Sequence, residues 1–217
     1  MTRSFLNILS VLVFGAAACA ANGPLPAPAM DAPIAKAPSK QTAVVAGGCF
    51  WGIQAVFQHV KGVVSATSGY SGGSSVTAQY QIVSTGATGH AESVKIVYDP
   101  SQITYGELLR VFFSVALDPT ELNRQGPDEG TQYRSAIFYG SDEQQHIAEA
   151  YIAQLDKAKV FSRPIVTQVV PLKAFYAAEA YHQNYAANHP DDLYIRYNDA
   201  PKVTRLRQQF PDLYTGK

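Results

Sequence analysis

The apolar positions of this chain change period along its length, from the period of a strand to that of a helix and back. A β-branched run at residues 42–46 predicts a buried strand, which ends in a tight turn at Gly47 and Gly48. Residues 49–59 follow with apolar side chains at helical spacing, and a cysteine stands at the start of this predicted helix. Its apolar face consists of Ile53, Val56, Phe57 and Val60.

Alternation returns in the next part of the chain. Residues 62–70 alternate moderately and residues 91–98 alternate more clearly, so both predict strands. A Gly/Ser-rich loop at residues 71–75 follows the first of them. One face of the second strand consists of Glu92, Val94, Ile96 and Tyr98.

Two later helices begin at capping boxes, in which a hydroxyl residue precedes Glu or Gln by three positions. Thr104 pairs with Glu107 in the first, and Ser141 pairs with Gln144 in the second, which runs to about residue 157. The remaining elements are predicted strands at residues 133–139 and 165–170 and a last predicted helix at residues 177–187.

Strands and helices therefore interleave, but not in a one-to-one rhythm. This order favours an α+β fold over a doubly wound parallel sheet. We expect one domain over residues 41–217, built as a two-layer α/β sandwich with a mixed sheet and a ferredoxin-like core.

The N-terminal residues predict a different kind of segment. Residues 1–20 have a basic start, an apolar run and a tract of small residues, which is the layout of a secretory signal peptide. The tract allows cleavage after Ala18 or Ala20, or lipidation of Cys19, so we expect an exported, periplasmic protein, either free or lipid-anchored. Residues 21–40 are rich in Ala and Pro without any periodicity, which predicts a disordered linker.

Composition excludes several classes of function. The 217 residues include 17 basic and 17 acidic side chains, and binding to nucleic acid or an anionic membrane requires clustered Lys and Arg. Two cysteines, Cys19 and Cys49, form neither a disulfide scaffold nor a four-cysteine zinc site, and no His/Cys spacing suits another metal. We expect a monomer without a metal.

Cys49 stands where a nucleophilic thiol is expected. It opens a helix after a Gly-Gly turn, and the free N–H groups and dipole of a helix start lower a thiol pKa. The alternative is a core role, since cysteine is among the most often buried residues. Phe50 and Trp51, the only tryptophan, adjoin it and offer apolar surface to a small apolar ligand group, which favours a site.

Glu92 is the second unusual residue, because it falls on the apolar face of its strand. A carboxyl group there loses water, its pKa rises, and it becomes a candidate general acid. A solvated strand end beside Gly89 and His90 explains the pattern equally well. Tyr80 and Tyr133 are two of thirteen tyrosines, and composition alone favours packing roles for them.

Four motifs occur in a distinctive order. They are Gly48-Cys49-Phe50-Trp51-Gly52, Gly89-His90-Ala91-Glu92, Asp128 with Gly130-Thr131-Gln132-Tyr133-Arg134-Ser135, and Tyr181-His182-Gln183-Asn184-Tyr185. Over about residues 44–190 this ordered set resembles the A-type methionine sulfoxide reductases, the peptide-methionine (S)-S-oxide reductase family. A single fragment is weak evidence, whereas the ordered set is specific.

The resemblance implies an oxidoreductase that reduces the S epimer of methionine sulfoxide in oxidised proteins and peptides. It implies that Cys49 attacks the sulfoxide sulfur and that Glu92 protonates the sulfoxide oxygen, to which Tyr80 and Tyr133 donate hydrogen bonds. The chemistry agrees, because a sulfoxide sulfur is a poor electrophile until its oxygen is protonated. The implied substrate-binding residues are Phe50 and Trp51, which hold the substrate methyl group, and Asp128, which has a supporting role.

Reduction leaves Cys49 as a sulfenic acid, which many relatives resolve with further cysteines near the C-terminus. Residues 190–217 contain none. The resemblance therefore implies no cofactor but an external reductant, which is a thioredoxin-like or glutaredoxin-like domain or a small thiol. Because the periplasm is kept oxidising, export also implies a dedicated exported reductase.

Two other functions fit parts of the pattern. An exported Cys-His hydrolase or peptidase would use Cys49 with a base from among His90, His182 and His189, whereas a reductase needs the acid Glu92. A non-enzymatic binding lipoprotein would tolerate replacement of Cys49 by serine.

Overall fold

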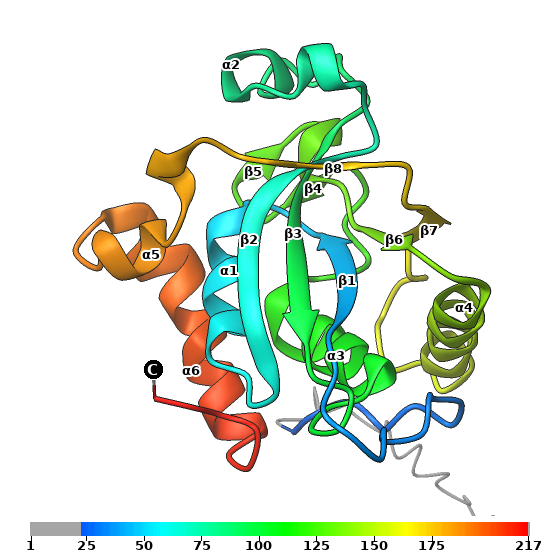
Figure 1. The fold of residues 1–217 in the computed structure, drawn as a ribbon. Coiled ribbons are helices and arrows are strands. Elements are labelled where there is room, and N and C mark those ends of the chain that lie inside the picture. The colour runs from blue at the N-terminus through cyan, green and yellow to red at the C-terminus, as the bar shows by residue number, and fades with distance from the viewer. Residues whose placement is uncertain (1–22, 217) are drawn as a thin grey trace, which may run out of the picture.

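A six-stranded sheet forms the centre of the molecule (Figure 1). The computed structural model describes residues 23–216, so the predicted signal segment and Cys19 lie outside the described residues. The strand order is β7-β6-β1-β3-β2-β8, and neighbours are antiparallel except β6 and β7, so the sheet is mixed. The strands are β1 Gln41–Ala46, β2 Val63–Ser71, β3 Ala91–Tyr98, β6 Ala136–Tyr139, β7 Gln168–Pro171 and β8 Phe175–Ala177.

The helices and the four central strands give the connectivity βαββαβ, the arrangement of a ferredoxin-like core. Helix α1 joins β1 to β2, and α3 lies between β3 and β6 in the chain. The α-helices are α1 Phe50–Gln58, α2 Tyr80–Val83, α3 Tyr105–Val111, α4 Asp142–Lys157, α5 Tyr185–Asn188 and α6 Ala200–Gln209. π-Helical turns at Phe112–Ala116 and Ile195–Asp199 extend α3 and precede α6, and β4 Arg124–Gln125 pairs with β5 Asp128–Glu129.

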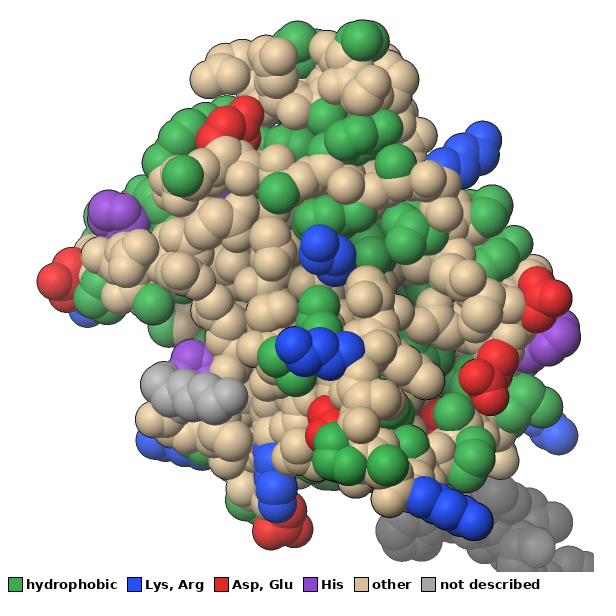
Figure 2. Space-filling view, viewed as in Figure 1, with side chains coloured by type: hydrophobic (Ala, Val, Ile, Leu, Met, Phe, Trp, Pro, Cys, Tyr) green, Lys and Arg blue, Asp and Glu red, His purple; other side chains and the backbone are tan. Residues whose placement is uncertain are grey.

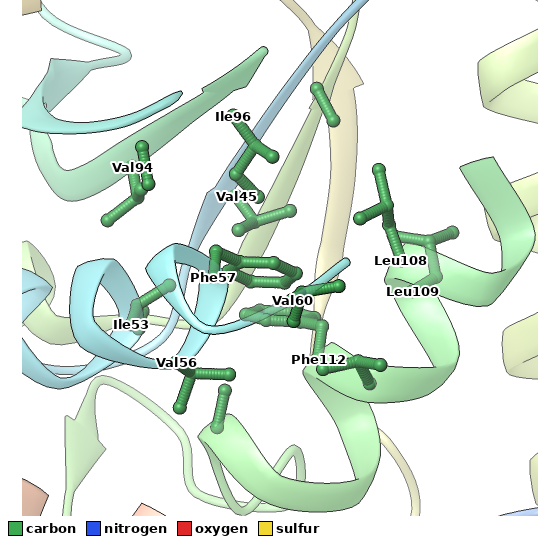
Figure 3. Close-up of a cluster of buried hydrophobic side chains, with 14 of the residues drawn as sticks. Val45, Ile53, Val56, Phe57, Val60, Val94, Ile96, Leu108, Leu109 and Phe112 are labelled. Atoms are coloured by element: carbon green, nitrogen blue, oxygen red, sulfur yellow. The ribbon is translucent and has the colours of Figure 1, made fainter. Parts of the chain in front are cut away.

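One face of the sheet packs against the helices and forms the main core. Figure 3 shows how alternate residues of β1 and β3 meet the apolar faces of α1 and α3. The residues labelled there are Val45, Ile53, Val56, Phe57, Val60, Val94, Ile96, Leu108, Leu109 and Phe112. Since Glu92 lies two residues before Val94 on β3, its side chain also points to this helical face.

The other face of the sheet has only a small apolar cluster. The chain between β7 and β8 crosses it, and Leu172 from this segment and Phe175 of β8 pack against the cluster that includes Val44 and Phe138. Figure 2 shows this side of the molecule, with its Lys, Arg, Asp and Glu side chains scattered rather than gathered into one charged patch. The helices therefore form the second layer, as a two-layer sandwich requires.

The C-terminal part differs from the sequence prediction. The predicted helix at residues 177–187 is wrong: Gln183 has an extended backbone and Asn184 a left-handed one (φ 57°), and these interrupt any helix. The actual C-terminal helix, α6, was not predicted, because it buries only Lys202 and Leu206 and so lacks a clear apolar period. The predicted strand at 133–139 begins only at Ala136, after a 3₁₀ turn.

The expectation of a disordered linker is also corrected for residues 23–40, which we call the N-terminal strap. Its backbone polar groups are bound by the domain: Arg110 Nε donates to the carbonyl of Leu25 at 2.6 Å, and the Tyr151 hydroxyl donates to that of Pro26 at 2.8 Å. Composition does not reveal such specific hydrogen-bond partners. No helix within residues 23–216 has the length and apolar character needed to cross a membrane.

Asp31 of the strap completes the start of α3. Thr104 is the N-cap residue, and its hydroxyl accepts the N–H of Glu107 at 3.1 Å, as the capping box predicts. The carboxylate of Asp31 accepts a hydrogen bond at 2.7 Å from the N–H of Gly106, another free N–H of this first turn. It also accepts a hydrogen bond from the hydroxyl of Thr104. A carboxylate at this position also interacts favourably with the helix dipole.

We therefore expect Asp31→Ala to lower the free energy of unfolding by about 1–2 kcal/mol, the usual cost of a lost helix cap, without changing activity. Urea unfolding followed by circular dichroism measures this. Lys36→Ala, in an exposed part of the strap, is the matched control. An Asp31→Ala protein as stable as the control would show that the strap does not hold α3.

Candidate active site

The Gly47-Gly48 turn places Cys49 at the start of α1, where it is the N-cap residue. Gly48 has φ 92°, and a Cβ there would lie 2.6 Å from Cβ of Gln125, so glycine is required. The N–H of Gly48 donates to the carbonyl of Tyr133 at 3.1 Å, which brings the third motif next to the first.

Glu92 lies directly beside this helix start. Its side chain is only 2% exposed, and its Oε2 accepts the N–H of Phe50 at 3.1 Å. Burial raises the pKa of Glu92 to about 8, the Phe50 N–H opposes the rise, and the carboxylates of Asp128 and Asp199 add to it. Glu92 therefore holds its proton at neutral pH, and the interpretation of a solvated strand end is wrong.

The thiol of Cys49 does not have the low pKa that its position at a helix start suggested. Burial, above all, raises its pKa well above the ordinary value, and the carboxylates of Glu92 and Asp199 add to this. The N–H of Trp51 and the ammonium of Lys202 lower it, but by less. The helix start lowers the pKa of Cys49 as predicted, but burial raises it by more, because Cys49 is only 7% exposed.

All seven predicted site residues line one small cavity of about 220 Å³. They come from β3, the start of α1, the start of α2, β5 and the turn before β6, which are far apart in the chain. The lining residues are Cys49, Phe50, Trp51, Tyr80, Glu92, Asp128, Tyr133 and Tyr194. The cavity thus combines a thiol, a protonated carboxyl, aromatic rings and hydroxyl groups.

Tyr194 is the lining residue that sequence reasoning missed. It is one of thirteen tyrosines and belongs to none of the four motifs, so no signal in the sequence distinguishes it. Its hydroxyl donates to the carboxylate of Asp128, and burial raises its pKa, as it does for Tyr80 and Tyr133. All three phenols are therefore neutral hydrogen-bond donors at physiological pH.

Arg134 holds the loops around the cavity together. Its Nη1 and Nη2 donate to the carbonyls of His90 at 3.0 Å and Gly89 at 2.9 Å, and Nη1 also donates to that of Thr131 at 2.9 Å. The second and third motifs are thereby fixed to one another. This explains why an arginine follows Tyr133 directly.

The histidines do not supply a base for the thiol, since none of them lines the cavity. Nδ1 of His90 accepts the N–H of Gly73 at 3.2 Å, and its Nε2 lies 2.9 Å from the carbonyl oxygen of Ser74. Nδ1 of His182 accepts the indole N–H of Trp51 at 3.3 Å. Within residues 23–216, no three His, Cys, Asp or Glu side chains lie close enough to hold a metal ion.

Comparison with known proteins identifies the family. The family model described as peptide methionine sulfoxide reductase matches residues 41–214. This chain belongs to the peptide methionine sulfoxide reductase family. A peptide methionine sulfoxide reductase of Mesorhizobium japonicum is 60% identical over 181 residues, 83% of this chain and 93% of that protein. One from Synechocystis is 52% identical over 172 residues, 79% of this chain and 80% of that protein.

Solved structures of the peptide methionine sulfoxide reductase family have the same fold. Mxr1 from Saccharomyces cerevisiae in reduced form aligns with a TM-score of 0.63 and 33% identity, over 72% of this chain and 92% of that one. Methionine sulfoxide reductase A of Corynebacterium diphtheriae aligns with a TM-score of 0.61 and 37% identity, over 71% and 77%. The protein is therefore an oxidoreductase that reduces methionine sulfoxide at the expense of thiols, and the hydrolase and binding-lipoprotein hypotheses are excluded.

The raised pKa of Glu92 predicts how stability depends on pH. Unfolded Glu has a pKa of about 4.3, whereas folded Glu92 has a pKa of about 8, so the folded state binds the proton more tightly. The free energy of unfolding therefore falls as pH rises between these values, by up to about 1.4 kcal/mol per pH unit, and the loss is complete above the folded pKa.

Glu92→Gln removes this loss, so the variant should gain stability over the native protein as pH rises from about 5 to about 8, and the gain should then level off. Urea unfolding at a series of pH values measures it. Glu129→Gln, an exposed carboxylate of β5, is the matched control and should show no such trend. A stability difference that does not depend on pH would mean that Glu92 is ionised in the folded protein.

Proposed function

We propose that the enzyme reduces the S epimer of methionine sulfoxide in oxidised proteins and peptides, with Cys49 as nucleophile and Glu92 as general acid. The observation that carries the proposal is the small cavity that Cys49 and Glu92 line together, with the carboxyl protonated at neutral pH. A sulfoxide needs both groups, because proton transfer to its oxygen makes its sulfur electrophilic.

In the first step, the sulfoxide oxygen moves from the substrate to Cys49. Glu92 gives its proton to the sulfoxide oxygen, and the Cys49 sulfur attacks the sulfoxide sulfur. The attack forms a bond between the two sulfur atoms, and the thiol proton passes to the Glu92 carboxylate. The oxygen then moves as a hydroxyl group to the Cys49 sulfur, while the S–O bond of the substrate and the new sulfur–sulfur bond both break. Methionine leaves with its sulfur reduced by two electrons, and Cys49 becomes a sulfenic acid, oxidised by two electrons.

The other lining residues fit supporting roles in this step. The phenols of Tyr80 and Tyr133 are neutral donors at the same cavity as Glu92, and in our proposal they stabilise the developing charge on the sulfoxide oxygen. Phe50 and Trp51 provide apolar surface for the substrate methyl group. Asp128, bound by the hydroxyl of Tyr194, has the supporting position near the substrate.

Return of Cys49 to the thiol requires an external reductant. The chain has no other cysteine between Cys49 and Lys217, so no second thiol of this part of the chain is available. One external thiol would condense with the sulfenic acid, releasing water, and a second would reduce the mixed disulfide. A thioredoxin-like or glutaredoxin-like domain, or a small thiol, supplies these two thiols without any bound cofactor.

Export is part of the proposal and is supported by the pattern of residues 1–20. The protein would act in the periplasm, released after cleavage or anchored through a lipid on Cys19. The N-terminal strap runs along the end of the sheet opposite the start of α1 (Figure 1), so it leaves the entrance to α1 uncovered. Oxidised surface methionines of other proteins could then reach Cys49.

A single turnover without reductant tests the activity. A chain that begins at residue 21 contains Cys49 as its one cysteine. Incubated with each sulfoxide epimer, it should consume one thiol per molecule and release methionine from the S epimer only, whereas Cys49→Ser should release none. Turnover of the R epimer, or thiol consumption without methionine release, would contradict the proposal.

The acid role of Glu92 predicts the pH profile. Because activity requires the protonated carboxyl, kcat/KM should fall as pH rises through about 8. Glu92→Gln should lower kcat/KM by about 10²–10⁴-fold and abolish this decline. Steady-state rates across pH measure both effects, with Glu129→Gln as the control, and an unchanged profile in Glu92→Gln would leave Glu92 a structural role only.

A further inference from the structure

The fourth sequence motif, residues 181–185, contributes no residue to the proposed chemistry, although it packs directly behind the cavity. His182 is 2% exposed. Its ring centroid lies 4.5 Å from that of Tyr80, 5.0 Å from that of Phe50 and 5.7 Å from that of Trp51. A buried, titratable ring thus contacts three of the residues that line the cavity.

The hydrogen bond between His182 and Trp51 determines which nitrogen of the imidazole carries the proton. The indole N–H of Trp51 is a donor only, so Nδ1 of His182 must present a lone pair, and the single proton of the neutral ring lies on Nε2. Within residues 23–216, Nε2 is buried without a hydrogen-bond partner, and Oε2 of Glu179 lies 3.9 Å away from it. A second proton on the imidazole would go to Nδ1, which would then no longer accept the hydrogen bond from the indole N–H.

The other contacts of Trp51 do not fix its orientation completely. Tyr185 stacks on the indole with a centroid distance of 3.9 Å and an interplanar angle of 11°. Stacking prevents tilting of the ring, but parallel planes can still slide and turn in their own plane. The directional bond to Nδ1 of His182 removes this remaining freedom.

Several titratable groups face His182. Glu179 accepts hydrogen bonds from the hydroxyl of Tyr70 at 2.8 Å and from the N–H of Tyr80 at 2.9 Å. The ring of Tyr181 is tilted against the imidazole, with 4.3 Å between the ring centroids. Asp128 lies beyond Trp51, through Tyr194. Burial lowers the pKa of His182 below its ordinary value, and Glu179 opposes this by less.

We propose that His182 is a positioning residue of the reductase: its neutral imidazole holds the indole of Trp51 at the angle at which it contacts the substrate methyl group, and protonation of His182 releases the ring. The contact with the methyl group rests on the proposed function, whereas the pairing of His182 with Trp51 is independent of it. The enzyme should therefore lose substrate affinity under acid conditions, as His182 takes up a proton. This loss is separate from the titration of Glu92, whose pKa of about 8 lies at higher pH.

The single tryptophan makes the pairing directly observable. Fluorescence of Trp51, excited where tyrosine does not absorb, should change in one step below the ordinary histidine pKa of about 6.5 in the native protein. His182→Asn, which keeps an acceptor but does not titrate, should lack this step. His189→Asn is the matched control, because exposed His189 contacts Tyr185, with 4.2 Å between the ring centroids, and the variant should retain the step.

Kinetics test the consequence. His182→Phe keeps a ring but has no acceptor. At neutral pH it should raise KM for methionine sulfoxide about tenfold, which corresponds to the loss of one hydrogen bond, and it should change kcat by less than about twofold. His182→Asn should stay within about threefold of the native KM. Should His182→Phe fail to fold, His182→Leu, which also lacks an acceptor, replaces it.

Persistence of the fluorescence step in His182→Asn, or an unchanged KM in the variant without an acceptor, would overturn the inference. A native protein that reduces no sulfoxide would instead overturn the proposed function, while the fluorescence titration would still decide whether His182 holds Trp51.

Discussion

The site depends on one interaction, the hydrogen bond from the N–H of Phe50 to the buried carboxyl group of Glu92. It joins the start of β3 to the first turn of α1, so the acid and the thiol of Cys49 reach the same cavity. The bond alone favours an ionised carboxyl, but burial has the larger effect and keeps the proton on Glu92. The proposed proton donor thus lies in a place that water barely reaches.

The fold supplies the rigidity that this burial requires. Helix α1 is held against β3, because Ile53, Val56 and Phe57 are buried in the main core together with Val94 and Ile96 of β3. The walls of the cavity, in contrast, are loops and short helices, and each is tied to its neighbours by specific polar contacts. Arg134 fixes the loop that bears His90, and Gln183 fixes the C-terminal segment through both the N–H and the carbonyl of Ser68.

Local periodicity predicted the parts of the structure that depend on local packing. The alternation of β3 placed Glu92 on the buried face, and the Gly-Gly turn placed Cys49 at a helix start; both are confirmed. The pKa of Cys49 was not predictable in the same way, since it depends on carboxylates and burial contributed by distant segments. Tyr194 and the N-terminal strap were missed for the same reason, because their partners, such as Asp128, are remote in the chain.

Glu92 is a neutral carboxylic acid in the folded enzyme at physiological pH, because its pKa is raised to about 8. Infrared difference spectroscopy of the native protein against Glu92→Gln reads this directly, because a protonated carboxyl and a carboxylate absorb at different frequencies. We expect a protonated carboxyl band at pH 7 that disappears as pH rises through about 8. A carboxylate band for Glu92 at pH 7 would contradict it.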